Sequence, residues 1–150
     1  MKTIILILSL FLATSCSNDD NNQTAQFTPV TFSEISKGEL FNGNYNPTQH
    51  GEVFNNSTDW NNFKNNVWQL ADFPPESDID FNNDIVITVF DEPRSTGGHS
   101  IDITSIIDNG QSVVVTFDKL MNGDATTIPT RPYHFVKIPT TSKPIEFATN

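Results

Sequence analysis

β-Branched and aromatic residues fill the stretch Ile85-Val86-Ile87-Thr88-Val89-Phe90, and similar runs follow it along the chain. The next two are Ser100-Ile101-Asp102-Ile103-Thr104-Ser105 and Val113-Val114-Val115-Thr116-Phe117. Residues of these types favour strands over helices. Asp108-Asn109-Gly110 stands between the last two runs and is a signal for a tight turn. Residues 79 onward therefore predict strands that are joined by short turns into an antiparallel sheet.

Further strands are expected on both sides of this region. Toward the C-terminus, Tyr133–Ile138 is a strand closed by Pro139, and residues 144–147 form a weaker one. Toward the N-terminus, residues 29–36 alternate between apolar and polar and predict a first strand, and residues 51–54 predict a short one. A loop between these two is marked by Gly38, Gly43, Asn44, Asn46 and Pro47.

One amphipathic helix is expected after residue 56. Apolar side chains recur there at intervals of three and four residues, with polar residues before them that can cap a helix. The capping candidates are Asn56, Ser57 and Thr58, the apolar residues are Trp60, Phe63, Val67 and Leu70 with Trp68 at the edge, and Pro74-Pro75 ends the segment. The fold class is therefore α+β, a mainly antiparallel β-sheet with one packed amphipathic helix.

The N-terminal segment has the pattern of an export signal. Lys2 is followed by an apolar run up to Leu12 and by the small residues Ala13-Thr14-Ser15 before Cys16. The apolar run is too short for a membrane-spanning helix, which needs roughly 20 residues. The sequence Leu12-Ala13-Thr14-Ser15-Cys16 resembles a bacterial lipoprotein signal, which implies that residues 1–15 are removed and that Cys16 is acylated, with palmitate among its chains. The alternative is a chance cysteine beside a signal that is cleaved elsewhere.

A polar segment follows the cysteine. No hydrophobic residue occurs from Ser17 to Thr24, so this stretch cannot bury enough apolar area to order itself. We expect residues 16–28 to be a flexible tether and residues 29–150 to be a single domain. Ser17 and the acidic residues after it resemble the sorting pattern of outer-membrane lipoproteins. The expected location is therefore the outer membrane, lipid-anchored on its periplasmic or cell-surface side.

Composition excludes several classes of function. The formal charge of −10 disfavours nucleic acid as a partner, because phosphate binding needs clustered Lys and Arg. A single cysteine excludes an internal disulfide and a cysteine-rich zinc site. His50, His99 and His134 are far apart, and the acidic residues 76–84 lack the glycine and closing Glu of an EF-hand loop. We expect no metal and no cofactor.

Two turns are candidates for binding a protein partner. In the first, Thr96-Gly97-Gly98-His99, adjacent glycines permit positive φ or a close approach by a partner's backbone. In the second, Arg131-Pro132-Tyr133-His134, a proline fixes the entry to a strand beside a charge and an aromatic ring. The alternative is that the glycines serve only the geometry of a hairpin and that Tyr133 belongs to the core. We expect the two turns to share one edge of a sheet.

Nucleophilic catalysis is disfavoured by strand geometry. Ser100, His99 and Asp102 include the atom types of a catalytic triad. Alternation along a strand, however, places Ser100 and Asp102 on one face and His99 on the other. His134 could approach from a neighbouring strand, although nothing in the sequence places it there. We therefore expect no catalytic residues.

The region from residue 80 to 140 resembles a known family. Residues 85–90 with Pro93-Arg94-Ser95-Thr96-Gly97-Gly98-His99 and the strand to Ile103 are similar to the C-terminal domain of the protease complex subunit PrcB. Residues 132–139, PYHFVKIP, are similar to the closing motif of that family. His99 departs from the aromatic residue usual after Gly-Gly. The resemblance implies a small envelope protein, often a lipoprotein, that associates with a protease and carries no known catalytic residues.

The sequence thus predicts a non-catalytic protein-binding accessory module, as a subunit or stabiliser of a protease complex. Two alternatives stay open. Ser95-Thr96-Gly97 and Arg131-Pro132-Tyr133 are similar to loops of chagasin-like inhibitors of cysteine proteases, although they stand too close together for that sandwich fold. An enzyme of unrecognised mechanism is the second alternative.

Overall fold

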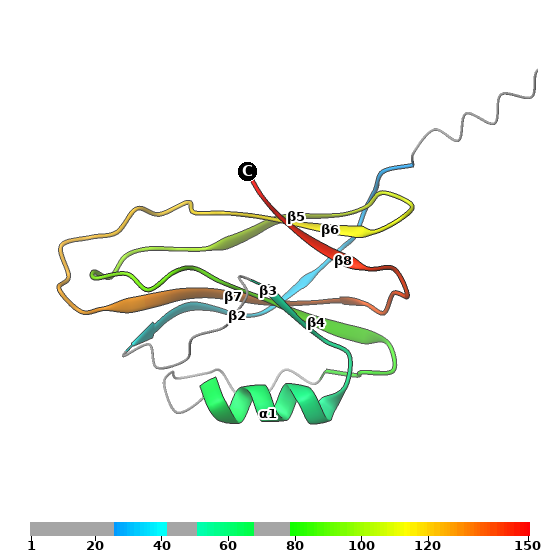
Figure 1. The fold of residues 1–150 in the computed structure, drawn as a ribbon, viewed down its shortest axis with the longest axis horizontal. Helices are drawn as coiled ribbons and strands as arrows, with labels where there is room; N and C mark the ends of the chain where they lie inside the picture. Colours follow the sequence, from blue (N-terminus) through cyan, green and yellow to red (C-terminus); the bar gives the residue numbers. More distant parts are fainter. Residues whose placement is uncertain (1–25, 42–50, 68–78) are drawn as a thin grey trace, which may run out of the picture.

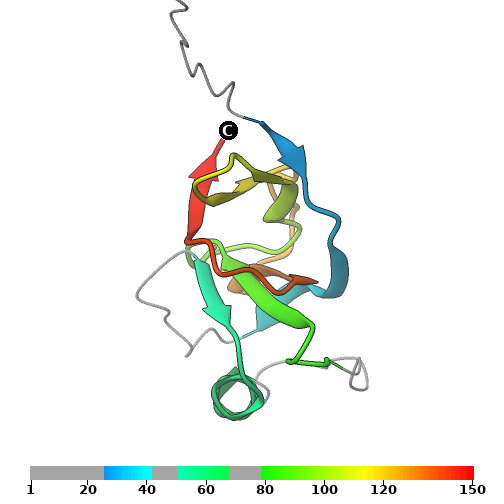
Figure 2. The same cartoon turned by 90° about the vertical axis from the view of Figure 1, so that its right-hand side faces the viewer.

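Two four-stranded β-sheets face each other in the computed structural model, which describes residues 26–41, 51–67 and 79–150 (Figures 1 and 2). Sheet A has the order β1 (Thr28–Pro29), β5 (Asp102–Asp108), β6 (Val113–Asp118) and β8 (Ile145–Thr149). Sheet B has the order β2 (Ser33–Phe41), β7 (Thr130–Pro139), β4 (Asp84–Phe90) and β3 (Gly51–Phe54), with helix α1 (Ser57–Val67) on its outer side. Neighbouring strands are antiparallel except β6 and β8, which are parallel. The α+β class is confirmed, although the strands form two sheets where one was expected.

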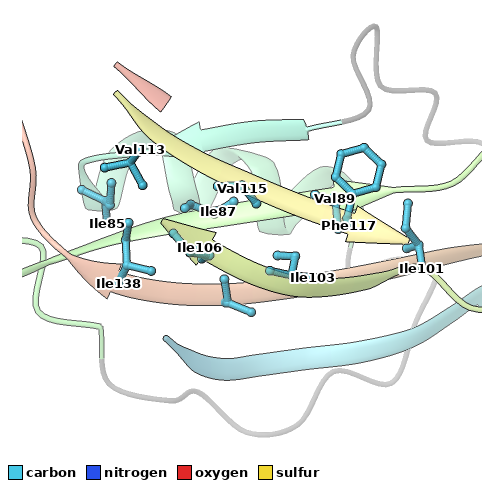
Figure 3. Packing of buried hydrophobic residues seen from close by; sticks show 11 residues of the cluster. Ile85, Ile87, Val89, Ile101, Ile103, Ile106, Val113, Val115, Phe117 and Ile138 are labelled. Carbon is cyan, nitrogen blue, oxygen red and sulfur yellow. The ribbon is translucent and has the colours of Figure 1, made fainter. Parts of the chain in front are cut away.

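Strand β4 is apolar at five of the six positions from Ile85 to Phe90 because both of its faces are covered. Ile85, Ile87 and Val89 point toward sheet A and belong to the core between the sheets, which Figure 3 shows. Val86 and Phe90 point the other way and pack under the helix. Successive side chains of a strand point to opposite faces, so a strand between two cores needs apolar residues at nearly every position.

The helix is fixed by its cap and by aromatic packing. The backbone N–H of Asp59 donates to Oδ1 of Asn56 at 2.9 Å, which identifies Asn56 as the N-cap. Trp60 and Phe63 are buried against sheet B, and their ring centroids lie 5.3 Å apart. The predicted contact of the helix with the sheet is therefore confirmed. Trp68, Leu70 and Pro74-Pro75 lie outside the described residues.

The predicted first strand over residues 29–36 is wrong, because the chain changes sheets within it. β1 pairs with β5 in sheet A, and β2 pairs with β7 in sheet B. Val30 and Phe32, between the two strands, pack against the inter-sheet core, which explains the apolar alternation that suggested one strand. Gly38 lies inside β2 and not in a loop. A Cβ on Gly38 would stand 3.2 Å from Oη of Tyr133. The other residues that marked this loop lie outside the described ranges.

The remaining predicted strands are confirmed with small shifts of their ends. β5 begins at Asp102 and not at Ser100, and β7 begins three residues before Tyr133. The turn between β5 and β6 has Gly110 at φ +92°, as the Asp108-Asn109-Gly110 signal predicts. Among the described residues, no helix has the length and apolar character that crossing a membrane requires.

Candidate functional site

Both predicted binding turns begin at one end of the two sheets, which we call the loop end. It consists of the β4–β5 connection (residues 91–101), the β6–β7 connection (residues 119–129) and Glu39 near the end of β2. Figure 1 shows the two connections side by side, in green and in yellow to orange. The backbones of Arg94 and Thr130 exchange hydrogen bonds of 2.8 and 3.0 Å, which join the first turn to the start of β7.

The Thr96–His99 turn is bonded along its length to the β6–β7 connection. The N–H groups of Gly123 and Asp124 donate to the carbonyls of Gly98 and Gly97 at 3.0 and 2.8 Å. Ser100 N–H donates to the carbonyl of Met121 at 3.3 Å. The two connections therefore support each other, and neither is an independent loop.

Two glycines permit this close contact. Gly98 has φ +74°, and a Cβ on it would stand 2.7 Å from Cγ of Asp124. Gly123 has φ +95°, and a Cβ on it would stand 2.5 Å from Nε2 of His99. A side chain at either position would meet both backbone strain and a steric clash. The segment whose close approach Gly98 permits in this structure is the protein's own β6–β7 connection.

Side chains also hold the first turn. Oγ1 of Thr96 hydrogen-bonds Nε2 of His99 at 2.9 Å, and the N–H of His99 donates to Oε1 of Glu39 at 2.7 Å. Oγ1 of Thr130 donates to the carbonyl of Thr96 at 2.9 Å. Thr96 and His99 remain half-buried, so part of each is on the surface of the loop end.

The residues of the second predicted turn lie inside β7 and are buried. Nε of Arg131 donates to the carbonyl of Asp91 at 2.9 Å, and the N–H of Asp91 donates to the carbonyl of Pro132 at 3.0 Å. Tyr133 is only 5% exposed, and its hydroxyl lies 3.1 Å from Oγ of Ser36. Tyr133 packs on the helix side of sheet B, whereas His134 faces sheet A. The structure thus brings Thr96 beside the start of β7. The side chains of Tyr133 and His134, however, point to opposite faces of sheet B.

A charged cluster lies behind the turns. Asp91, whose side chain is 1% exposed, lies 2.6 Å from Nη2 of Arg94 and 2.9 Å from Nζ of Lys119. Glu92 lies 3.0 Å from Nη2 of Arg94 and 3.4 Å from Nζ of Lys119. Burial raises the pKa of Asp91, but the hydrogen bonds from Lys119 and Arg94 outweigh it and hold the pKa below its usual value. The same bond to Asp91 raises the pKa of Lys119. The cluster fixes both connections in place.

A second polar cluster joins the two sheets. Asp102 of β5 forms an ion pair with Lys37 of β2 and accepts a hydrogen bond of 2.6 Å from Oγ of Ser100. Burial raises the pKa of Asp102, but the hydrogen bonds from Lys37 and Ser100 lower it by more than burial raises it. The pKa of Asp102 is therefore below its usual value. Nδ1 of His134 accepts a hydrogen bond of 2.9 Å from the N–H of Ile103. Burial lowers the pKa of His134 despite the nearby Glu34, whose Oε2 lies 3.4 Å from Nε2.

This cluster does not have the geometry of a catalytic triad. Ser100, which precedes the start of β5, donates to Asp102, and His99 is bonded to Thr96. Among the hydrogen bonds of the described residues, none joins Ser100 to His134, whose Nδ1 already accepts from the backbone of β5. Nor do the described ranges contain a group of three side chains that could hold a metal ion.

The β6–β7 connection was not among the residues that the sequence indicated as a binding site. Of the five large apolar side chains that are exposed among the described residues, three lie on it: Leu120 (61%), Met121 (57%) and Ile128 (48%). The available signal was its length. The connection has eleven residues without a strand pattern, whereas loops between antiparallel strands usually have about two to five, and longer loops are often functional.

Both connections of the loop end lie in a segment that matches a known family model. Residues 85–139, from β4 to the end of β7, match the family model described as PrcB C-terminal. Both sequence motifs that suggested the resemblance lie within these residues, and that resemblance is confirmed for this segment. Neither the curated proteins nor the solved structures include a significant match to the chain.

Proposed function

We propose that this protein is a non-catalytic accessory module that binds and supports a protease complex, because residues 85–139 match the family model described as PrcB C-terminal. The family match is the observation that carries the proposal, because the protein after which that family is named is a subunit of a protease complex. A protein acting in this way needs a stable surface for its partner and no reactive group.

The loop end supports this proposal. Its two connections are held by backbone hydrogen bonds and by the ion pairs around Asp91, so the surface is ordered before a partner arrives. A surface that is already ordered loses less conformational entropy on binding, which favours affinity. The half-buried Thr96 and His99 lie on this surface, and Arg131, Tyr133 and His134 lie beneath or behind it. Direct contact of a partner with any of the eight predicted residues, Thr96, Gly97, Gly98, His99, Arg131, Pro132, Tyr133 and His134, stays a prediction.

The proposed location is the outer membrane, through a lipid on Cys16. The signal-like residues 1–15 and the polar residues after Cys16 support this location. A tether that begins at Cys16 and ends before β1 would place the domain within reach of a protease in the same envelope layer. Several acyl chains on one cysteine would give stable attachment, whereas a single chain gives only marginal binding.

Affinity purification of the tagged full chain from its own envelope, followed by mass spectrometry, tests the function. We expect a protease to be enriched in near-equal amount over a control that carries residues 1–28 fused to an unrelated domain. We also expect the purified chain to slow the dissociation or loss of that protease without changing its activity per molecule. Absence of any enriched protease would contradict the proposal. Stoichiometric inhibition of a papain-like protease would instead support the chagasin-like alternative.

A further inference from the structure

The β6–β7 connection combines a fixed backbone with exposed large apolar side chains. Its backbone is bonded to Gly97, Gly98 and Ser100, and Met121 N–H also donates to Oγ of Ser100 at 3.1 Å. Leu120 and Met121 nevertheless remain more than half exposed, and Ile128 nearly so. Exposed apolar side chains that cluster on one segment are typical of surfaces that bind another molecule.

The loop end carries two carboxylates, Glu39 and Asp124, in addition to its cluster of ion pairs. Arg94 and Lys119 are paired with Asp91 and Glu92, and Arg131 is buried, so these three cations are engaged within the loop end. Glu39 and Asp124 flank the turn: a Cβ on Gly97 would lie 3.5 Å from Oε2 of Glu39 and 3.7 Å from Oδ1 of Asp124. Hydrogen bonds from Thr126 hold the pKa of Asp124 below its usual value, so it is charged at neutral pH.

We propose that Leu120, Met121 and Ile128 form the docking surface for a partner protein whose contact site is apolar and rimmed by Lys or Arg side chains. The inference deepens the proposed function, on which it rests, by assigning the surface and the chemistry of the partner. A second copy of this chain fits less well as the occupant, because each copy carries a formal charge of −10 and would present the same acidic rim.

The partner contact is tested first by photo-crosslinking in cells. A photoreactive phenylalanine analogue replaces Leu120 in the full chain, and in a control chain it replaces Phe27, which is also exposed but lies beside β1, away from the loop end. We expect crosslinks from position 120 to a protein other than this chain, and none to that protein from position 27. Crosslinks only between copies of this chain, or none at position 120, would overturn the proposal.

The chemistry is then tested with the crosslinked protein in purified form. We expect Leu120→Ser with Met121→Ser to weaken its binding at least tenfold, whereas Phe27→Ser leaves affinity within twofold. Raising the salt from 50 to 300 mM is expected to slow association several-fold, because salt screens the attraction between the acidic rim and a basic site. Circular dichroism checks that each variant is folded. Unchanged affinity in the double variant, or association independent of salt, would overturn the assignment.

The two proposals fail in distinguishable ways. If a protease co-purifies with both the wild-type chain and the Leu120→Ser, Met121→Ser variant in equal amount, the proposed function stands and the docking surface is wrong. If position 120 crosslinks to a basic partner that is neither a protease nor part of a protease complex, the docking surface stands and the proposed function is wrong.

Discussion

Nδ1 of His134 accepts a hydrogen bond of 2.9 Å from the backbone N–H of Ile103, and this bond joins the central strand pair of sheet B to sheet A. The bond requires an unprotonated Nδ1, so the neutral ring with its proton on Nε2 is the form that fits. Lys37, Glu34 and Asp102 are the charged groups around the ring, from strands β2 and β5. Burial and Lys37 lower the pKa of His134, while Glu34 and Asp102 oppose this shift.

The stability of the protein is therefore expected to fall as the pH drops below about 6.5, the usual pKa of the unfolded histidine. In that range the unfolded chain takes up a proton that the folded chain resists, so acid favours unfolding. The loss is at most about 1.4 kcal/mol per pH unit for one proton. His134→Asn retains an acceptor near the position of Nδ1 but does not titrate, and it should flatten this slope in urea unfolding between pH 7 and 5. A slope equal to that of the wild type, with His99→Asn as control, would contradict this account.

Phe63 is the centre of the aromatic contact between α1 and sheet B. Its ring centroid lies 4.7 Å from that of Phe54 and 5.6 Å from that of Phe135. Phe63→Ala should lower the free energy of unfolding by about 3 to 5 kcal/mol, because it removes a buried ring and leaves a cavity. Asn62→Ala, on the exposed side of the same helix, is the matched control. A loss below about 1 kcal/mol in urea unfolding would indicate that the helix does not hold this position in solution.

Gly98 and Gly110 both have positive φ, but only Gly98 has a neighbour within reach of a new Cβ. Gly110→Ala should cost about 1 kcal/mol from backbone strain alone. Gly98→Ala should cost more, because the methyl group would also clash with Asp124. Equal losses in the two variants would show that Asp124 is not packed on Gly98. If the Gly98 variant lost more partner binding than its unfolded fraction explains, this would indicate that the partner contacts the turn directly at Gly98.

Membrane attachment is expected to depend on Cys16. Cys16→Ser should release the protein from the membrane fraction or leave residues 1–15 attached, because serine cannot carry the thioether-linked lipid. Detergent-free fractionation with immunoblotting measures the distribution, and Thr24→Ala is the control because it leaves the cysteine and the residues directly after it intact. An unchanged distribution of the Cys16 variant would argue against a lipoprotein.

Local sequence patterns were sufficient for most of the elements. The β-branched runs predicted β4, β5, β6 and β7, and Asp108-Asn109-Gly110 predicted the turn that joins two of them. The spacing of Trp60 and Phe63 predicted the helix and its buried side. These features depend on propensity and periodicity over a few residues, which a single sequence contains. The family motifs at residues 85–103 and 132–139 were equally local, and the family match includes both.

Only the tertiary structure decided which strands share a sheet and what surrounds each side chain. Val30 and Phe32 alternate as in one strand, yet the chain crosses between sheets there because both side chains fill the inter-sheet core. The glycines at 97 and 98 indicated a turn, but the segment packed against them lies some 25 residues later, at Asp124. Arg131 and Tyr133 belong to a motif that suggested a surface, and long-range strand pairing buries both. Such pairings depend on the free energy of the whole fold, because burial is shared among segments that are distant in the sequence.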